Sequence, residues 1–179
     1  MNRDFSLDGK SKYEIETTVT SWGGTGVIAS GKIPRGHFII EYIGEIITKE
    51  ESQERLTEDN RLGITNFYQI VLGNGLFWLK SQLSDFRLKT DNKDKNRMID
   101  SGREGNIARF MNHSCNPNCE TMTWSVNGEK RIGIYSLKDI ELGEELTFNY
   151  QLMQTGVAKT KCLCNESNCA GFIGDKIKR

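Results

Sequence analysis

The sequence predicts a compact, mainly β fold with few short helices and a C-terminal tail held by a metal ion. Short β-rich runs alternate with glycines along the 179 residues, and no internal repeat or low-complexity linker interrupts them. Residues 121–135 show the clearest strand–turn–strand pattern, and residues 162–169 carry a cysteine cluster. With 36% hydrophobic and 27% charged residues, the chain reads as one globular domain with its own core.

Four segments account for the predicted strands. In residues 121–135 apolar side chains alternate up to Asn127-Gly128 and alternate again afterwards, which is typical of a tight hairpin. Residues 37–47, HFIIEYIGEII, are nearly all apolar and indicate a buried strand pair, or one strand bent at Gly44. Residues 66–72 and 145–150 are two further short strands.

Two short helices are expected between these strands. Thr48 and Glu51 stand at the spacing of a capping box, so residues 48–56 read as a short exposed helix. Within residues 105–111, Ile107, Phe110 and Met111 have helical spacing and predict a buried turn of helix. The C-terminal end of that helix would deliver the polar pair that follows it.

Charge and hydropathy narrow the class of protein. The formal net charge is +0, so the molecule as a whole is not a nucleic-acid polyelectrolyte. Residues 41–60 hold seven acidic and two basic side chains; such a face suits a basic peptide, and a solvated helix surface explains it equally well. No apolar run approaches the length of a bilayer span, and residues 1–13 are too polar for a signal peptide, so we expect no membrane association.

The five cysteines predict a metal site rather than a disulfide framework. Their number is odd, and three of them form the motif C-x-C-x4-C at Cys162, Cys164 and Cys169. Thiolates this close repel one another unless a cation lies between them, and Zn²⁺ is the usual one. Ordinary buried thiols are the alternative. A tetrahedral site needs a fourth ligand, and the residues left open for that role are Cys115, Cys119, His113 and His37.

Five motifs in order resemble a SET-domain histone lysine methyltransferase with its post-SET zinc tail. They are GTG (24–26), EYIGE (41–45), RFMNHSCNPNC (109–119), ELTFNY (145–150) and CLCNESNC (162–169). The run from residue 119 to residue 150, with NCAGFIG near the end, is most similar to the NSD, Ash and Set-two group, which methylates lysine-36 of histone H3.

The resemblance implies the SET fold, in which short β-sheets surround a core threaded through a pseudo-knot. The SET domain would cover residues 13–151 and the post-SET zinc tail residues 152–179. Residues 1–12 would correspond to the end of the cysteine-rich pre-SET region that this group carries before the SET core. Residues 73–96 form an insertion where the family has only a few residues, and we expect no catalytic role for it.

The resemblance also assigns roles to individual residues. Tyr150 corresponds to the catalytic tyrosine, and Tyr42 to a second catalytic hydroxyl that lines the lysine channel, ranked above Tyr68. Cys115 corresponds to the fourth zinc ligand, beside Cys162, Cys164 and Cys169. Cys119 would then pack in the core. The implied cofactor contacts are Gly24, Thr25, Gly26, Thr65, Asn66, Phe67, Tyr68, Arg109, Asn112, His113, Tyr150 and Ile173. Thr25 stands where this group often has Trp.

The implied activity is transfer of a methyl group from S-adenosylmethionine to a lysine amine of histone H3, at lysine-36 in nucleosomes, with S-adenosylhomocysteine as product. The protein would be a nuclear, chromatin-bound monomer with structural Zn²⁺ and indirect contact with DNA. Three alternatives stay open: methylation of lysine-4 of histone H3, methylation of a non-histone lysine, and a non-catalytic SET module that binds histone tails. Non-catalytic modules typically lose the tyrosine or the Asn-His pair, whereas this chain keeps Tyr150, Asn112 and His113.

Overall fold

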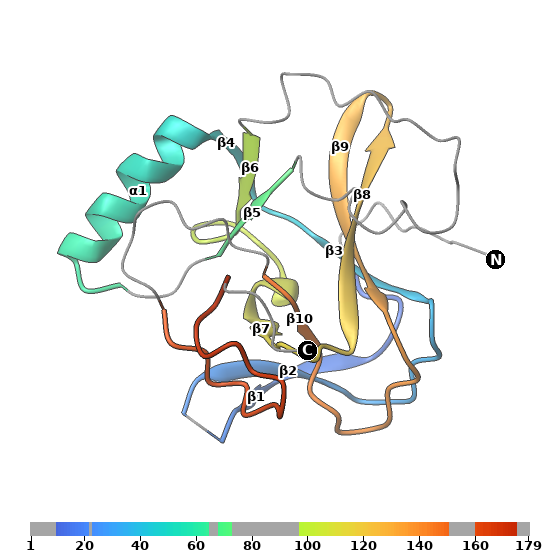
Figure 1. The fold of residues 1–179 in the computed structure, drawn as a ribbon. Coiled ribbons are helices and arrows are strands. Elements are labelled where there is room, and N and C mark those ends of the chain that lie inside the picture. The colour runs from blue at the N-terminus through green and yellow to red at the C-terminus, as the bar shows by residue number, and fades with distance from the viewer. Residues whose placement is uncertain (1–9, 22, 65–67, 73–96, 151–159, 175–179) are drawn as a thin grey trace.

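A computed structural model describes residues 10–21, 23–64, 68–72, 97–150 and 160–174. Within them, short strands form three sheets around one hydrophobic core, with a single α-helix at the side (Figure 1). The predicted mainly β architecture is therefore confirmed. The expected insertion at 73–96 and most of the expected pre-SET segment 1–12 lie outside the described residues, as do residues 66 and 67 of the expected strand at 66–72.

The largest sheet has the strand order β3-β9-β8-β10-β7. Its members are β3 (Phe38–Tyr42), β7 (Asn112–His113), β8 (Cys119–Val126), β9 (Glu129–Ser136) and β10 (Thr147–Phe148). Strands β8 and β9 form the predicted hairpin, and Asn127 and Gly128 take the positive φ values of 51° and 83° that its tight turn requires.

The late strand β10 lies between two strands that precede it in the chain. It pairs in parallel with β7 through Phe148 and His113, and with β8 through Phe148 and Cys119. The predicted strand at 145–150 is thus confirmed but only two residues long. This parallel insertion places the segment before Tyr150 beside the segment that carries Asn112.

The other sheets flank this one. Strands β1 (Ile15–Val19) and β2 (Thr25–Ala29) form an antiparallel pair, and the third sheet has the order β4-β6-β5. Its strands are β4 (Glu45–Thr48), β5 (Gln69–Val71) and β6 (Arg97–Asp100). The apolar run 37–47 is therefore a strand pair divided between two sheets, because β3 ends before Gly44 and β4 begins after it.

Helix α1 (Lys49–Arg61) begins where the capping pattern predicts and runs further than the predicted residue 56. The Thr48 hydroxyl accepts a hydrogen bond from the Glu51 amide at 3.2 Å. Arg55 then anchors the helix to the neighbouring sheet, with ion pairs of 2.6 Å to Glu45 and 2.9 Å to Asp100. These polar contacts hold a helix that buries only Ser52.

The expected helix at 105–111 is a 3-10 helix of four residues, Ile107–Phe110. Asn106 caps it by accepting a hydrogen bond from the Ala108 amide, and Met111 already has extended backbone. Because the turn ends there, Asn112 and His113 lie in β7 and not on a helix. Met111 is 1% exposed and joins the core, as its spacing predicted.

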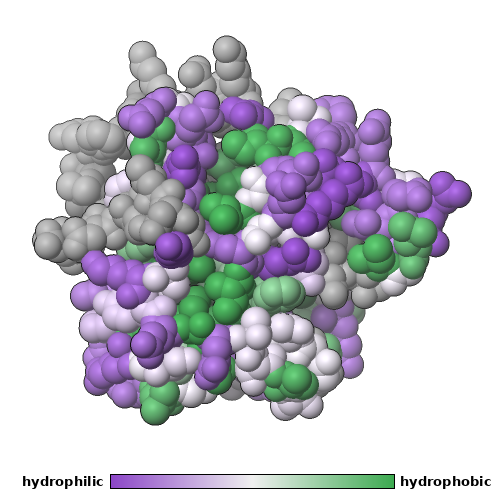
Figure 2. Space-filling model, turned by 180° about the vertical axis from the view of Figure 1, so that it is seen from behind, coloured by the Kyte–Doolittle hydropathy of each residue, from purple (hydrophilic) through white to green (hydrophobic). Residues whose placement is uncertain are grey.

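The core contains side chains from all three sheets, such as Val27 of β2, Ile39 of β3 and Ile99 of β6. Its fully buried side chains include Val27, Ile33, Ile39, Ile40, Ile132, Ile134, Ile140 and Leu146. On the rear face of the molecule, exposed apolar residues gather in a central band flanked by hydrophilic ones (Figure 2). No helix in the described residues is long and apolar enough to cross a membrane.

Candidate active site and metal centre

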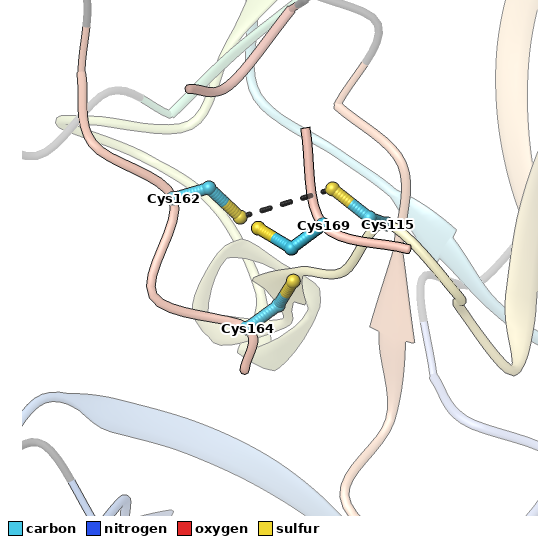
Figure 3. A group of neighbouring side chains, drawn as sticks. All are labelled: Cys115, Cys162, Cys164 and Cys169. Atoms are coloured by element: carbon cyan, nitrogen blue, oxygen red, sulfur yellow. Dashed lines mark hydrogen bonds between the residues drawn. The ribbon is translucent and has the colours of Figure 1, made fainter. Parts of the chain in front are cut away.

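The four cysteines that the resemblance implied as ligands lie together. The sulfurs of Cys115, Cys162, Cys164 and Cys169 are all within 4.8 Å of one another, and those of Cys115 and Cys162 are 3.9 Å apart. Figure 3 shows one cysteine from the loop after β7 and three from the C-terminal segment, with their sulfurs turned toward a common centre. The tail therefore folds back onto the NHSC segment.

This donor set fits a tetrahedral metal ion. Sulfurs about 2.3 Å from a central Zn²⁺ would stand roughly 3.8 Å apart, close to the observed spacing. Burial raises the pKa of the Cys115 and Cys162 thiols. A dication at the centre of the cluster favours the deprotonated thiolates, and four thiolates are a ligand set that Zn²⁺ prefers.

The other residues left open for the fourth position are not members of this group of four sulfurs. The Cys119 sulfur is fully buried in β8, where it donates to the Asn118 Oδ1 at 3.4 Å, and His37 contacts the Tyr13 hydroxyl. His113 is adjacent to the cluster, with its Nε2 3.5 Å from the Cys115 sulfur. Its Nδ1 accepts a hydrogen bond from the Tyr150 amide at 3.2 Å, so His113 links the cluster to Tyr150.

A cavity of about 530 Å³ opens between the large sheet and the C-terminal segment. Its size is within the usual range for small-molecule sites. Eight of the implied cofactor contacts line it: Gly24, Thr25, Tyr68, Arg109, Asn112, His113, Tyr150 and Ile173. Thr65, Asn66 and Phe67 lie outside the described residues. Residues far apart in the chain thus share one cavity.

Gly26 lies behind the cavity wall and does not line it. A Cβ there would be 2.7 Å from the Glu145 Oε1 and 2.8 Å from the Thr20 Cγ2, closer than such atoms approach. A side chain at position 26 would therefore displace the Glu145 carboxylate and the Thr20 methyl group, because both pack against the β2 backbone at this point. The expected approach of the Gly26 backbone to a cofactor stays a prediction.

Tyr150 follows β10 and places its ring at the cavity. Its hydroxyl donates to the Met111 carbonyl at 2.9 Å, and its ring packs against His113 and Phe148, with centroids 5.4 Å and 5.0 Å away. Burial raises the pKa of the Tyr150 hydroxyl above its ordinary value, and the Tyr42 and Tyr68 hydroxyls and the Glu145 carboxylate raise it further. The phenol is therefore neutral at physiological pH.

Tyr42 is near this centre but does not line the cavity. It is 3% exposed, and its hydroxyl donates to the Tyr68 carbonyl at 2.9 Å. Burial raises its pKa, so this hydroxyl also stays neutral. Tyr68 lines the cavity instead, with the Arg109 guanidinium 4.4 Å from its ring centroid. Tyr42 thus touches the cavity wall from behind.

Two polar residues of the site were not anticipated. Glu145 lines the cavity and accepts a hydrogen bond from the Asn112 Nδ2 at 2.8 Å. Asn118 donates to the Glu145 carbonyl at 2.7 Å and accepts from the Thr147 amide at 2.9 Å, which fixes the start of β10. The polar density of NHSCNPN was visible in the sequence, but nothing local indicated that Glu145 would meet Asn112.

Comparison with known proteins identifies the family. The SET domain matches residues 24–151 of this chain. A human protein named histone-lysine N-methyltransferase, H3 lysine-36 specific, is 43% identical over 170 residues, which cover 94% of this chain and 6% of that protein. Mouse histone-lysine N-methyltransferase NSD3 is 40% identical over 92% of this chain and 10% of its own length.

The alignment with a plant relative covers a larger share of that relative's length. Histone-lysine N-methyltransferase ASHR3 of Arabidopsis thaliana is 36% identical over 99% of this chain and 30% of that protein. The chain therefore spans less than a third of each of these relatives. The family match itself covers well over half of the chain, including Asn112, His113 and Tyr150. On this ground the chain belongs to the SET domain family.

Proposed function

We propose that this chain is a histone-lysine N-methyltransferase that uses S-adenosylmethionine and acts on lysine-36 of histone H3 in nucleosomes. The observation that carries the proposal is the single cavity that joins the neutral Tyr150 phenol, the Asn112-His113 pair and the cysteine-held tail. Relatives named H3 lysine-36 specific, at 36–43% identity over most of the chain, support the choice of substrate.

S-adenosylmethionine supplies a methyl group activated by attachment to a sulfonium. Gly24, Thr25, Asn112, His113 and Ile173 would hold it, since all five line the cavity. Arg109 and Tyr68 would close the wall next to them, because the guanidinium stacks on the tyrosine ring. We retain Gly26 as a support of this wall and Thr65, Asn66 and Phe67 as predicted contacts.

The substrate amine must lose its proton before it attacks. Free lysine has a pKa near 10.4, and a cavity that excludes water lowers it because the charged form loses hydration. Tyr150 would orient the amine through its hydroxyl, which is held by the Met111 carbonyl. Tyr42 would support this arrangement from behind through the Tyr68 carbonyl. Alignment of the amine with the methyl group in a dry site would then favour transfer.

The metal centre has a structural part in this proposal. Zn²⁺ held by Cys115, Cys162, Cys164 and Cys169 would fix the tail that carries Ile173 across the cavity. The protein would be a monomer in the nucleus, where it meets nucleosomes and contacts DNA only indirectly. S-adenosylhomocysteine would leave as product.

The direct test is transfer of labelled methyl groups to recombinant nucleosomes. We expect label on histone H3, unchanged when alanine replaces lysine at position 4 and lost when alanine replaces lysine at position 36. Equal labelling of both variants would overturn the assignment to lysine-36. No labelling of histones, with S-adenosylmethionine bound, would instead favour a non-histone substrate or a histone-binding module.

A second arm tests Tyr150. Tyr150→Phe removes the hydroxyl and keeps the buried ring, so we expect transfer to fall by roughly a hundredfold or more while S-adenosylmethionine still binds. The matched control is Tyr13→Phe, since the Tyr13 hydroxyl contacts His37 and not the cavity. Full activity in Tyr150→Phe would remove the phenol from the mechanism.

A further inference from the structure

The amide of Asn112 has both of its donor hydrogens engaged within the protein. Its Nδ2 donates to the Thr25 carbonyl at 3.0 Å and to the Glu145 Oε1 at 2.8 Å. Both partners can only accept, so the orientation of the amide is fixed by its neighbours. A ligand in the cavity can therefore reach only the acceptor oxygen of Asn112, which suits a cation or another donor.

Glu145 adds a full negative charge to the same wall. Within the described ranges it forms no ion pair, whereas Glu144 beside it pairs with the Lys138 Nζ at 2.8 Å. Both glutamates line the cavity. The charge of Glu144 is therefore largely compensated by Lys138, and that of Glu145 is available to a ligand.

The backbone around Glu145 is held firmly. Its carbonyl accepts from the Asn118 Nδ2, Ile28 and Glu145 form a β-bridge, and the next amide, of Leu146, donates to the Val27 carbonyl at 2.7 Å. The missing Cβ of Gly26 leaves the space that the carboxylate occupies. The Glu145 carboxylate is therefore held in a defined position in the cavity wall.

The substrate and product of the proposed reaction differ in charge at one atom. S-adenosylmethionine carries a sulfonium cation, and S-adenosylhomocysteine carries a neutral thioether at the same place. Their ammonium and carboxylate groups are identical. A carboxylate that contacted only the ammonium would bind both equally, so discrimination requires that its field reach the sulfur.

We propose that Glu145 is a specificity-determining residue that makes the cavity prefer S-adenosylmethionine over S-adenosylhomocysteine through its charge. This inference rests on the proposed function. Glu145 contacts Asn112, and the ring of the next residue, His113, packs 5.4 Å from the Tyr150 ring, so the carboxylate lies in the same part of the cavity as the proposed transfer centre. The consequence for turnover is that spent product is released in favour of fresh cofactor.

The test is calorimetric titration of the zinc-loaded protein with each ligand separately. Glu145→Gln keeps an acceptor for Asn112 and removes the charge. We expect it to weaken S-adenosylmethionine binding on the order of tenfold and to leave S-adenosylhomocysteine within about twofold. Sinefungin, whose protonated amine stands in place of the sulfonium, should follow S-adenosylmethionine.

The matched control is Glu144→Gln, which makes the same change at the neighbouring, Lys138-paired position. Its ratio of the two affinities should stay within about twofold of the wild-type ratio. An unchanged ratio in Glu145→Gln, with both ligands bound normally by wild type, overturns the inference and leaves the proposed function intact. Wild type that binds neither ligand overturns the proposed function and this inference together.

A structural role for Glu145 has its own signature. If Glu145→Gln melts cooperatively but binds neither ligand, the side chain supports the cavity and the charge proposal is wrong. If Glu145→Gln does not fold, Glu145→Asp decides, because it keeps the charge. A ratio near wild type in that variant supports the proposal, and a tenfold lower ratio contradicts it.

Discussion

The large sheet and the C-terminal segment 160–174 contact the same cavity, but different forces hold them. The sheet buries side chains such as Ile134 and Leu146 completely, each at 0% exposure. In the C-terminal segment only Cys162 is buried, while Leu163 and Phe172 are 47% and 40% exposed. Hydrophobic burial therefore stabilises one wall of the cavity, and the thiol cluster is the main attachment of the other.

Because of this difference, folding of the large sheet and ordering of the C-terminal segment over the cavity depend on different interactions. We expect the sheet to form without metal, because buried apolar area and the β8–β9 ladder stabilise it. Residues 160–174 have backbone hydrogen bonds such as Cys162 N to Gly171 O at 2.9 Å, and side-chain hydrogen bonds of Asn168 to the Cys115 carbonyl at 3.2 Å and of Asn116 to Glu166 at 3.3 Å. We therefore expect perturbations of the two walls to give different patterns of damage.

Metal removal should have the largest effect, and only on the tail. After chelation we expect the Cys162 and Ile173 amides, which are hydrogen-bonded at 2.9 Å, to exchange hydrogen roughly a hundredfold faster. Amides of the β8–β9 hairpin should keep their protection. Equal loss in both regions, followed by hydrogen exchange with mass spectrometry, would show that the tail and the sheet are one cooperative unit.

A substitution that leaves a void in the core beneath the large sheet should destabilise both walls of the cavity. Ile134→Ala removes fully buried methyl groups, and we expect it to lower the free energy of unfolding by about 3 kcal/mol. Leu142→Ala is the control, since that side chain is 72% exposed and its loss should cost less than about 0.5 kcal/mol. Urea unfolding of the zinc-loaded protein measures both; similar costs would mean that the sheet is not the stabilising wall.

The ion pairs of α1 should matter less than the core but more than a surface pair. Arg55 is 12% exposed and binds Asp100, which is 6% exposed, so Arg55→Ala leaves a buried carboxylate with fewer partners. We expect a loss of about 2 kcal/mol, because Glu45 and Glu51 are partly hydrated. Arg61→Ala, which breaks an exposed pair with Glu58, should cost about 0.5 kcal/mol or less.

The smallest effect concerns the buried phenols and appears only at alkaline pH. The raised pKa values of Tyr42 and Tyr150 mean that the folded protein keeps protons which the unfolded chain loses. Their contribution to the free energy of unfolding is complete below about pH 10 and decreases as the pH rises further.

Tyrosinate absorbance checks this directly. Between about pH 9 and about pH 11 the folded variants Tyr42→Phe and Tyr150→Phe should titrate like wild type, since neither hydroxyl ionises there. In denaturant each variant should lose the share of one of the five tyrosines. A lower amplitude in a folded variant would mean that its hydroxyl is exposed to solvent.

Features fixed by neighbouring residues could be predicted from the sequence. The Asn127-Gly128 turn and the Thr48 cap depend on residues within a few positions of one another, and both are confirmed. The helix expected at 105–111 is a single 3-10 turn because Asn106 caps it and Met111 leaves helical geometry to enter the core. Periodicity indicated the buried face of that segment and not its length.

Features that depend on distant residues could not be predicted from patterns. The parallel placement of β10 against β7 sets Glu145 beside Asn112, and neither residue is unusual in its own segment. The same holds for Arg55 and Asp100, which are 45 positions apart. Motif spacing left four candidates for the fourth ligand, and only the family resemblance selected Cys115, which the clustered sulfurs confirm as a neighbour of the other three.

The most direct test of a cavity with one metal-held wall is the affinity for S-adenosylmethionine with and without zinc. Calorimetric titration should give an affinity at least about tenfold weaker for zinc-free protein, with recovery when zinc is added back. The hydrogen-exchange protection of the β8–β9 hairpin, including the Trp124 amide, should stay unchanged throughout. Equal affinity before and after verified removal of zinc would contradict the account, because the cysteine-held tail would then contribute nothing to the site.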